Sequence, residues 1–262
     1  MENNLRNIYL QGKNQIIMKR FFMLLSFTIC TTFIFAQPLV STWAGTGAPG
    51  VISAGVHRLS AGLDMPYGVA IDSRGNLWMS EEGGNGYGFI IKMIRPDDTV
   101  RVRAGGVSED CFKNGASTAA RFSQPRGLAV DANDNIYVAD FGNSVIRKID
   151  KFLSVFNNQW VSVFAGKWDS TSACYIRHPG YADGPVKTAQ FNGPSDIAFN
   201  KTKDTMYIAD AMNNCIRKIV NGQVTTVAGH PDSAGFRDGT TANAKLNFPT
   251  GVFVAANGDI YV

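Results

Sequence analysis

Cysteine and histidine are scarce in this chain of 262 residues, which contains four cysteines and three histidines. No C-x-x-C pair, H-x-H motif or H-E-x-x-H motif occurs, so the sequence predicts no zinc or redox centre. The chain also lacks the G-x-S-x-G elbow of serine hydrolases and a P-loop that would cradle phosphate. We therefore predict no catalytic residues, no metal site and no cofactor.

Excess charge is also missing once the first 36 residues are set aside. The whole chain has 25 basic and 21 acidic residues, a net charge of +4. Four of the basic residues and one acidic residue lie in this first segment, so 21 basic and 20 acidic residues remain. A nucleic-acid-binding protein needs a clustered basic face. The sequence therefore predicts no nucleic-acid partner.

Long apolar runs are absent apart from one near the N-terminus. From Met18, two basic residues precede an apolar run over 21–35, and the small residue Ala36 follows. This is the form of a secretory signal peptide, and the run is shorter than the roughly 20 residues of a membrane span. We predict an N-terminal extension and signal peptide over 1–36, with the signal at about 18–36.

Cleavage of this signal would leave residues 37–262 as the mature chain. We expect a secreted, periplasmic or cell-surface protein with no stable membrane span after cleavage. A retained N-terminal anchor is the alternative that the sequence leaves open.

The rest of the chain is built from an internal repeat of a proline, an alternating apolar segment, a polar turn and a second alternating segment. The copies are MPYGVAIDSRGNLWMS from Met65, QPRGLAVDANDNIYVAD from Gln124, GPSDIAFNKTKDTMYIAD from Gly193 and FPTGVFVAANGDIYV from Phe248. Two copies continue into IRKI and the first into IIKM, and three units close with a segment ending in Ala-Gly. A period of two predicts strands. Four short strands per unit predict an all-β protein, a β-propeller with about three complete four-stranded blades and a partial one.

A further copy of the closing segment, VSTWAG, stands at 40–45 without the three strands that should precede it. A propeller must close, because an open ring exposes strand edges. We expect this segment to complete the last blade as its outer strand.

The fullest copy, P-x-G-x-A-x-D-x-x-x-N-x-Y-V-A-D-x-x-N-x-x-I-R-K-I from Pro125 to Ile149, resembles the NHL-repeat family of β-propellers, in the exported bacterial type. The resemblance covers Val40 to Val262. It implies a ring of about six blades, whereas this sequence stops within the second strand of its fourth unit. We therefore expect a C-terminally truncated fragment of an NHL-type propeller.

Insertions join the Ala-Gly of one unit to the proline of the next. Their last part has a regularly spaced alanine and large apolar residue, as in Ala120 with Phe122 and Ala189 with Phe191, which predicts a packed helical turn against the blade. Three insertions are 20 or 21 residues long, and the one from Gly166 to Pro194 is 28.

The added length lies in KWDSTSACYIRHPGY, which is rich in aromatic and basic residues. Rigid scaffolds carry function on such loops, and aromatic residues and arginine anchor recognition surfaces. We predict a loop that binds a protein or glycan ligand; its candidate residues are Trp168, Tyr175, Arg177, His178 and Tyr181. The alternative is a long loop that covers an apolar rim.

The first unit departs from the others, because it has Ser80 where we align Asp140 and Asp210. A longer glycine-rich loop follows, with Glu81 and Glu82. We expect these glutamates to be solvated, and we keep them as a secondary candidate loop for ligand contact.

Polar positions that recur in the second and third units are predicted to be structural; they are Asp140, Asn143, Arg147, Asp210, Asn213 and Arg217. We expect the aspartates to accept backbone N–H bonds in the turn to the asparagine. The arginines are expected to pack or pair between blades.

Three cysteines follow the signal peptide: Cys111, Cys174 and Cys215. Export permits disulfides. Because Cys111 and Cys174 lie in consecutive insertions, we favour a bond between them, with no disulfide as the open alternative.

These observations favour an exported, noncatalytic propeller that acts as a protein- or glycan-binding scaffold. The alternative is a propeller enzyme, a metal-dependent lyase or lactone hydrolase with its site at the central channel. Histidines His57, His178 and His230 all lie in insertions, but they do not recur at equivalent positions. The visible inner strands are mostly apolar, which favours the binding module. A repeat segment of a larger cell-surface protein is a third interpretation.

Overall fold

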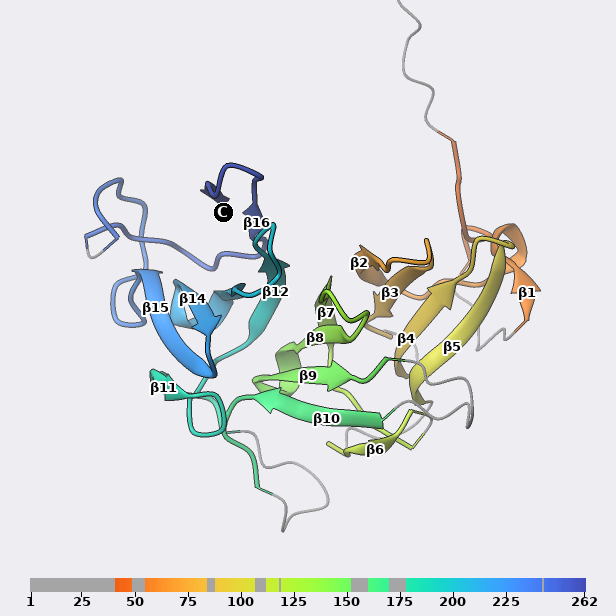
Figure 1. Cartoon of the computed structure of the whole chain (residues 1–262), viewed down its shortest axis with the longest axis horizontal. Helices are drawn as coiled ribbons and strands as arrows, with labels where there is room; N and C mark the ends of the chain where they lie inside the picture. The colour runs from red at the N-terminus through yellow and green to blue at the C-terminus, as the bar shows by residue number, and fades with distance from the viewer. Residues whose placement is uncertain are drawn as a thin grey trace, which may run out of the picture. The chain divides into compact units, whose positions relative to one another are not determined.

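A computed structural model describes residues 41–48, 55–83, 88–106, 112–117, 119–151, 160–169, 178–241 and 243–262. Within these residues the strands form three five-stranded antiparallel sheets and one two-stranded sheet, shown in Figure 1. The predicted signal peptide lies outside the described residues.

The first sheet has the strand order β1-β5-β4-β3-β2 and consists of β1 (Val56–His57), β2 (Pro66–Ile71), β3 (Leu77–Glu81), β4 (Phe89–Ile94) and β5 (Thr99–Gly106). The second has the order β6-β10-β9-β8-β7 and consists of β6 (Gly115–Ala116), β7 (Pro125–Val130), β8 (Ile136–Asp140), β9 (Val145–Ile149) and β10 (Trp160–Ala165). The third has the order β11-β15-β14-β13-β12 and consists of β11 (Gly184–Pro185), β12 (Pro194–Phe199), β13 (Met206–Asp210), β14 (Cys215–Val220) and β15 (Gln223–Gly229). The last pairs β16 (Phe253–Val254) with β17 (Ile260–Tyr261).

This arrangement confirms the predicted all-β propeller architecture, with three blades followed by the first hairpin of a fourth. The innermost strands β2, β7 and β12 lie beside one another, with β7 between the other two (Figure 1). Apolar clusters fill the space between consecutive blades: Trp78 and Met93 pack with residues of the second blade such as Leu128, and Tyr137 packs with residues of the third such as Ile197.

Each blade has a fifth, two-residue strand that we did not predict. Strands β1, β6 and β11 come from the insertions and pair with the outer strand of the blade that follows. Gly115 and Gly184 begin two of them with φ of 137° and 127°, in the region that favours glycine. This requirement explains the glycines that stand ten residues before the proline in the second and third units; the first unit has Val56 there.

The rest of the insertion contains the helical turn that the spacing predicted. The Ala120 N–H donates to the Ala116 carbonyl at 2.9 Å, and the Ala189 N–H donates to the Pro185 carbonyl at 2.9 Å. Both alanines are fully buried, and Phe122 and Phe191 are at most 1% exposed, so each turn packs onto the blades.

The segment 41–48 has no assigned strand but makes the contacts of an outer-strand end. Its Gly45 N–H donates to the Arg58 carbonyl at 2.9 Å, as Gly105 donates to Ser117 at 3.0 Å in the next unit. The segment thus lies against the first insertion as the end of a preceding blade would. Its role in completing the last blade stays a prediction.

Inner strands approach each other closely at one position of the repeat. A Cβ on Gly127 would lie 2.5 Å from the Asp196 Cα, far inside van der Waals contact. Asp196 occupies the corresponding position of the third unit, and its carboxylate accepts the Val252 N–H at 2.9 Å in the fourth. Glycine at 127 therefore sets the spacing between the second and third blades.

Replacing Gly127 with alanine tests this spacing. Overpacking in a tight contact costs about 1–3 kcal/mol, and we expect Gly127→Ala to lower the free energy of unfolding by about 2 kcal/mol in guanidinium denaturation. Gly251→Ala is a matched control, because its Cβ would lie 3.7 Å from the Asp196 carboxylate, in ordinary contact. Equal losses in the two variants would contradict a steric cause.

Candidate functional site

A buried acid–base pair joins the second and third strands in each of the three blades. The oxygen–nitrogen distances are 2.8 Å for Glu81–Lys92, 2.9 Å for Asp140–Arg147 and 2.8 Å for Asp210–Arg217, and no side chain in these pairs is more than 1% exposed. A buried charge is tolerated only when it is paired and hydrogen-bonded. These pairs are therefore the centres around which the polar interactions of each blade are arranged.

The aspartate of the second blade satisfies both of its oxygens. Asp140 Oδ1 accepts the Ser123 N–H at 2.8 Å, and Oδ2 accepts the Asn143 side-chain amide at 2.9 Å as well as Arg147. The structure thus brings together the predicted aspartate, asparagine and arginine. We expected the backbone donor to lie in the turn that leads to the asparagine. The donor is instead Ser123, which precedes the first strand of the blade, and the turn contributes only the Asn143 side chain. Asp210 repeats this pattern with the Asn192 N–H and the Asn213 amide, each at 2.8 Å.

The arginine binds the insertion that leads into its own blade. Arg147 donates to the Arg121 carbonyl at 2.9 Å, the Lys113 carbonyl at 2.8 Å and Asn114 Oδ1 at 2.9 Å. Our expectation of pairing between blades is therefore wrong. The carboxylate lies on the adjacent strand of the same sheet, so the guanidinium remains within its own unit and fastens the insertion to it.

Blades two and three differ at one partner of the arginine. Arg147 meets the neutral Asn114, whereas Arg217 donates to the carboxylate of Asp183 at 2.6 Å. Burial lowers the pKa of Arg147. Burial also acts to lower the pKa of Arg217, but the charge of Asp210 and the hydrogen bond to Asp183 outweigh this effect, so the pKa of Arg217 is raised. Burial raises the pKa of Asp210 to about 6, against the opposing charge of Arg217.

The first blade contains the same pair in another form, which corrects our alignment. Pro66 lies opposite Glu81 just as Pro125 lies opposite Asp140, so Glu81, and not Ser80, occupies the aspartate position. Glu81 is 1% exposed rather than solvated as we expected. Burial raises its pKa, and the hydrogen bond and charge of Lys92 oppose that rise. The longer glutamate pairs with lysine here, and the Lys92 ammonium also donates to the Gly62 carbonyl at 2.8 Å.

The predicted loop of the third insertion contributes to this scaffold. The Arg217 guanidinium carbon lies 4.9 Å from the centre of the Tyr181 ring, and the Tyr181 hydroxyl lies 2.8 Å from Thr226 Oγ1. Phe112 covers Arg147 in the same way at 4.5 Å, and Trp168 lies 5.7 Å from Phe112.

Of the remaining candidates in this loop, the structure describes His178. His178 is half-buried. The predicted residues Tyr175 and Arg177, and the candidate disulfide of Cys111 with Cys174, lie outside the described residues. Cys215 is buried, and burial raises the pKa of its thiol.

A second site, which the sequence analysis missed, lies where the inner strands begin. The Arg126 guanidinium carbon is 3.5 Å from the centre of the Phe141 ring and 5.1 Å from that of Tyr67. Phe248 extends the group, 6.5 Å from Phe141. Two hydrogen bonds of 3.1 Å hold Arg126 to Glu82, which was one of our secondary candidates. We call Tyr67, Arg126, Phe141 and Phe248 the aromatic–arginine cluster.

The backbone beside this cluster is strained at a recurring position. The residue before each unit's proline has a left-handed φ: 48° at Met65, 51° at Gln124, 59° at Gly193 and 50° at Phe248. Such a conformation costs a non-glycine residue roughly 1–2 kcal/mol. It leaves the Met65 and Phe248 side chains 53% and 42% exposed. Gly193 is the only one of these four residues whose type signals a left-handed φ in the sequence.

Comparison with known proteins identifies the repeat. Residues 103–234, about half of the chain, match the family model described as the Teneurin NHL domain. The chain belongs to the NHL-repeat family. This confirms the resemblance seen in the sequence. The match spans the pairs Asp140–Arg147 and Asp210–Arg217, so the scaffold described above lies in the matched part of the NHL repeats.

Relatives of this NHL-repeat chain are much longer proteins. Teneurin-3 of Danio rerio is 35% identical over 46% of this chain and 4% of its own length. NHL repeat-containing protein 2 of Homo sapiens is 24% identical over 84% of this chain and 32% of its own length. The chain thus spans about a third or less of these curated relatives.

A solved structure with the same fold is an auxiliary nutrient binding protein from Bacteroides thetaiotaomicron, with a TM-score of 0.50 and 14% identity. The match covers 76% of this chain and 56% of that one. Among the residues the structure describes, no helix is long and apolar enough to cross a membrane.

Removing the cation of the first NHL unit tests the buried pair. We expect Lys92→Met to lower the free energy of unfolding by about 3–5 kcal/mol, because Glu81 would remain as a buried, uncompensated charge. Lys148→Met removes the partly exposed pair with Asp150 and should cost no more than about 1 kcal/mol. A double variant, Glu81→Leu with Lys92→Met, should recover much of the loss. Similar effects of the two lysine substitutions in chemical denaturation would count against the buried pair.

The inner-strand carboxylate Asp196 predicts a pH dependence. Burial raises its pKa, and hydrogen bonds from Val252 and Ile197 oppose this only in part. Since the folded pKa lies above the unfolded value near 3.8, stability from this group is present at low pH and is lost as the pH rises through the folded pKa. Asp196→Asn cannot ionise, but it keeps only one of the two oxygens that accept the Ile197 and Val252 N–H groups. We therefore expect the stability of the variant relative to the parent to rise as the pH increases from about 3.5 to 7. A difference in thermal stability that is independent of pH would rule out ionisation as its cause.

Proposed function

We propose that this chain is an exported, noncatalytic NHL-repeat module that binds a protein or glycan ligand at the strand ends where the insertions lie. The observation that carries the proposal is the aromatic–arginine cluster. Tyr67 comes from the first unit, Arg126 and Phe141 come from the second and Phe248 comes from the fourth, so the arrangement of the blades creates a surface that no single unit contains.

The chemistry of this cluster suits recognition. Arginine and aromatic residues supply most of the binding energy at protein interfaces, and aromatic faces also stack on sugar rings. Arg126 is held in place by Glu82 and by the Phe141 ring, so little side-chain entropy would be lost on binding. Tyr67 and Phe248 are 43% and 42% exposed and therefore still available to a ligand.

We propose that the third insertion extends the same surface. Its Tyr181 is 36% exposed, and its ring also lies 5.6 Å from that of His230. The proposed ligand surface therefore includes the predicted loop with Trp168 and Tyr181, and the fixed tyrosine connects that loop to the buried arginine below. We further propose that the segment at about 18–36 directs export and that residues 37–262 form the mature module.

Binding assays with matched aromatic variants test this proposal. The full chain would be screened on a glycan panel and against a panel of displayed extracellular protein domains, and each ligand found would be titrated. We expect Tyr67→Ala and Phe248→Ala each to weaken binding about tenfold or more, as loss of a central aromatic anchor does.

Trp160→Ala is the control for these variants, because Trp160 is 56% exposed but lies on the outer strand β10. It should leave the affinity unchanged. Equal effects of all three substitutions, or none from Tyr67 and Phe248, would refute the placement of the ligand on the cluster.

A further inference from the structure

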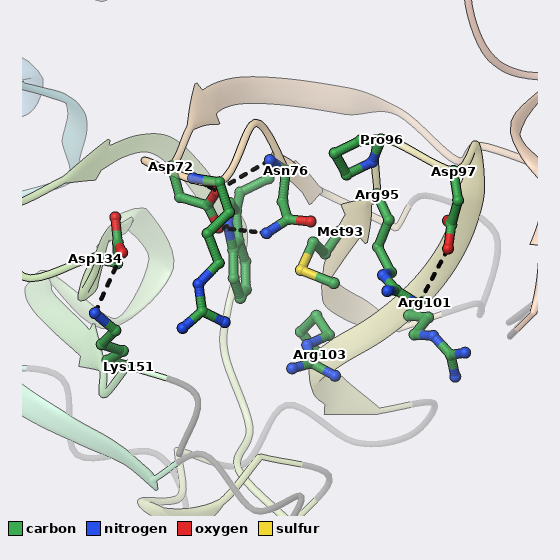
Figure 2. A pocket seen from close by; sticks show the side chains of 12 residues that line it. Asp72, Asn76, Met93, Arg95, Pro96, Asp97, Arg101, Arg103, Asp134 and Lys151 are labelled. Carbon is green, nitrogen blue, oxygen red and sulfur yellow. Dashed lines mark hydrogen bonds and ion pairs between the residues drawn. The ribbon is translucent and has the colours of Figure 1, made fainter. Parts of the chain in front are cut away.

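A groove with a volume of about 680 Å³ lies at the opposite ends of the strands from the aromatic–arginine cluster. The turn between β2 and β3, the turn between β4 and β5, and the edge of the second blade surround it. Figure 2 shows Arg95, Arg101 and Arg103 along one side and the Asp134–Lys151 pair on the other. The proposed ligand surface does not use any of these residues.

The charges that line this groove are unequal. Five cationic residues face three carboxylates; the cations are Arg74, Arg95, Arg101, Arg103 and Lys151, and the carboxylates are Asp72, Asp97 and Asp134. The lining therefore carries two more positive than negative charges, although the chain after its first 36 residues is nearly neutral.

The carboxylates of the groove are already engaged. Asp72 holds the β2–β3 turn, because its oxygens accept the backbone N–H of Arg74 at 3.0 Å, the Asn76 amide at 2.8 Å and the Trp78 indole N–H at 2.9 Å. Asp97 accepts the Thr99 N–H at 3.1 Å and pairs with Arg95 at 3.2 Å.

The third carboxylate, Asp134, is held by Ser73. It accepts the Ser73 N–H at 2.9 Å and hydroxyl at 2.7 Å and lies 3.4 Å from the Lys151 ammonium. These hydrogen bonds lower the pKa of Asp134, and those from Thr99 lower the pKa of Asp97, so both remain ionised at neutral pH.

The arginines carry the unbalanced charge. Arg101 and Arg103 are two residues apart on β5, and both line the groove. Burial lowers the pKa of Arg103, and the charges of Arg101 and Arg95 lower it further. Neither the Arg74 nor the Arg101 guanidinium has a hydrogen bond or ion pair with another described residue, and both are exposed. Two of the groove's guanidinium groups, those of Arg74 and Arg101, therefore have no hydrogen-bond acceptor among the described residues.

The geometry points to a binding site for a small ligand with several oxyanion groups. A planar guanidinium donates two parallel hydrogen bonds to a carboxylate, sulfate or phosphate, and it does so more specifically than an ammonium group. A ligand with at least two such groups can meet Arg74 on the β2–β3 turn together with Arg101 and Arg103 on β5. Its binding would relieve the repulsion among the arginines, which an uncharged ligand could not do.

Titration calorimetry of the full chain with two probes tests this site. Sucrose octasulfate presents sulfate groups on a sugar, and inorganic tripolyphosphate presents phosphate without one. We expect at least one probe to bind at low salt, and the affinity to fall as salt is added. Tighter binding of the first would assign the site to a sulfated saccharide, and tighter binding of the second to a phosphorylated ligand.

The double variant Arg74→Gln with Arg101→Gln should weaken binding about tenfold, since it removes two charge-assisted contacts. Both side chains are exposed and make no hydrogen bond or ion pair within the described part of the chain, so an unchanged unfolding curve should accompany the loss. Lys201→Gln is the matched control, because Lys201 is an exposed cation in the equivalent turn of the third blade. Absence of binding by the parent chain, or equal weakening by the control, would overturn the proposal.

Discussion

The buried acid–base pair is the interaction on which each blade depends. Removing two charges from water costs several kcal/mol per ion, and only close pairing with further hydrogen bonds offsets that cost. The pair Asp140–Arg147 meets this condition because backbone and side-chain partners from the insertion surround it. A pair of this kind contributes less to net stability than to uniqueness, since a shift in strand register would leave a charge buried without its partner.

This constraint explains how the insertions can differ while the frame stays the same. The arginine donates to backbone carbonyls, which any sequence supplies. The insertion is therefore held mainly through its backbone and depends little on its side chains. Asn114 and Asp183 show that even the one side-chain acceptor can change. Phe112 covers Arg147 and Tyr181 covers Arg217, which shields each ion pair from water. Residues of the insertion farther from the arginine are then not needed to stabilise the pair. The sequence of the insertion can therefore vary on this face without cost to the fold.

The sequence was sufficient for the strands, the blade repeat and the family, because period-two patterning and the motif from Pro125 to Ile149 are local. It was insufficient where the answer depends on register or on distant residues. The sequence alignment matched Ser80 to Asp140, one residue away from the correct match, Glu81. Only the strand register, in which Pro66 lies opposite Glu81, fixes the equivalent position. The two-residue outer strands are too short to have a period. The aromatic–arginine cluster is invisible in any one unit, since Tyr67 and Phe248 are separated by most of the chain.

The charge of arginine side chains is balanced differently at the two ends of the strands. At the insertion end, Arg126 has a carboxylate and aromatic rings around it, so the surface is nearly neutral and offers mainly apolar contact. At the other end, turns built on Asp72 consume their own carboxylates in backbone hydrogen bonds, and the arginines of β5 keep their charge. A carboxylate that accepts the backbone N–H groups of its own turn is not free to form an ion pair with a neighbouring arginine. Because five cations face only three carboxylates, the groove carries excess positive charge, whereas Arg126 at the other end of the strands is paired with Glu82.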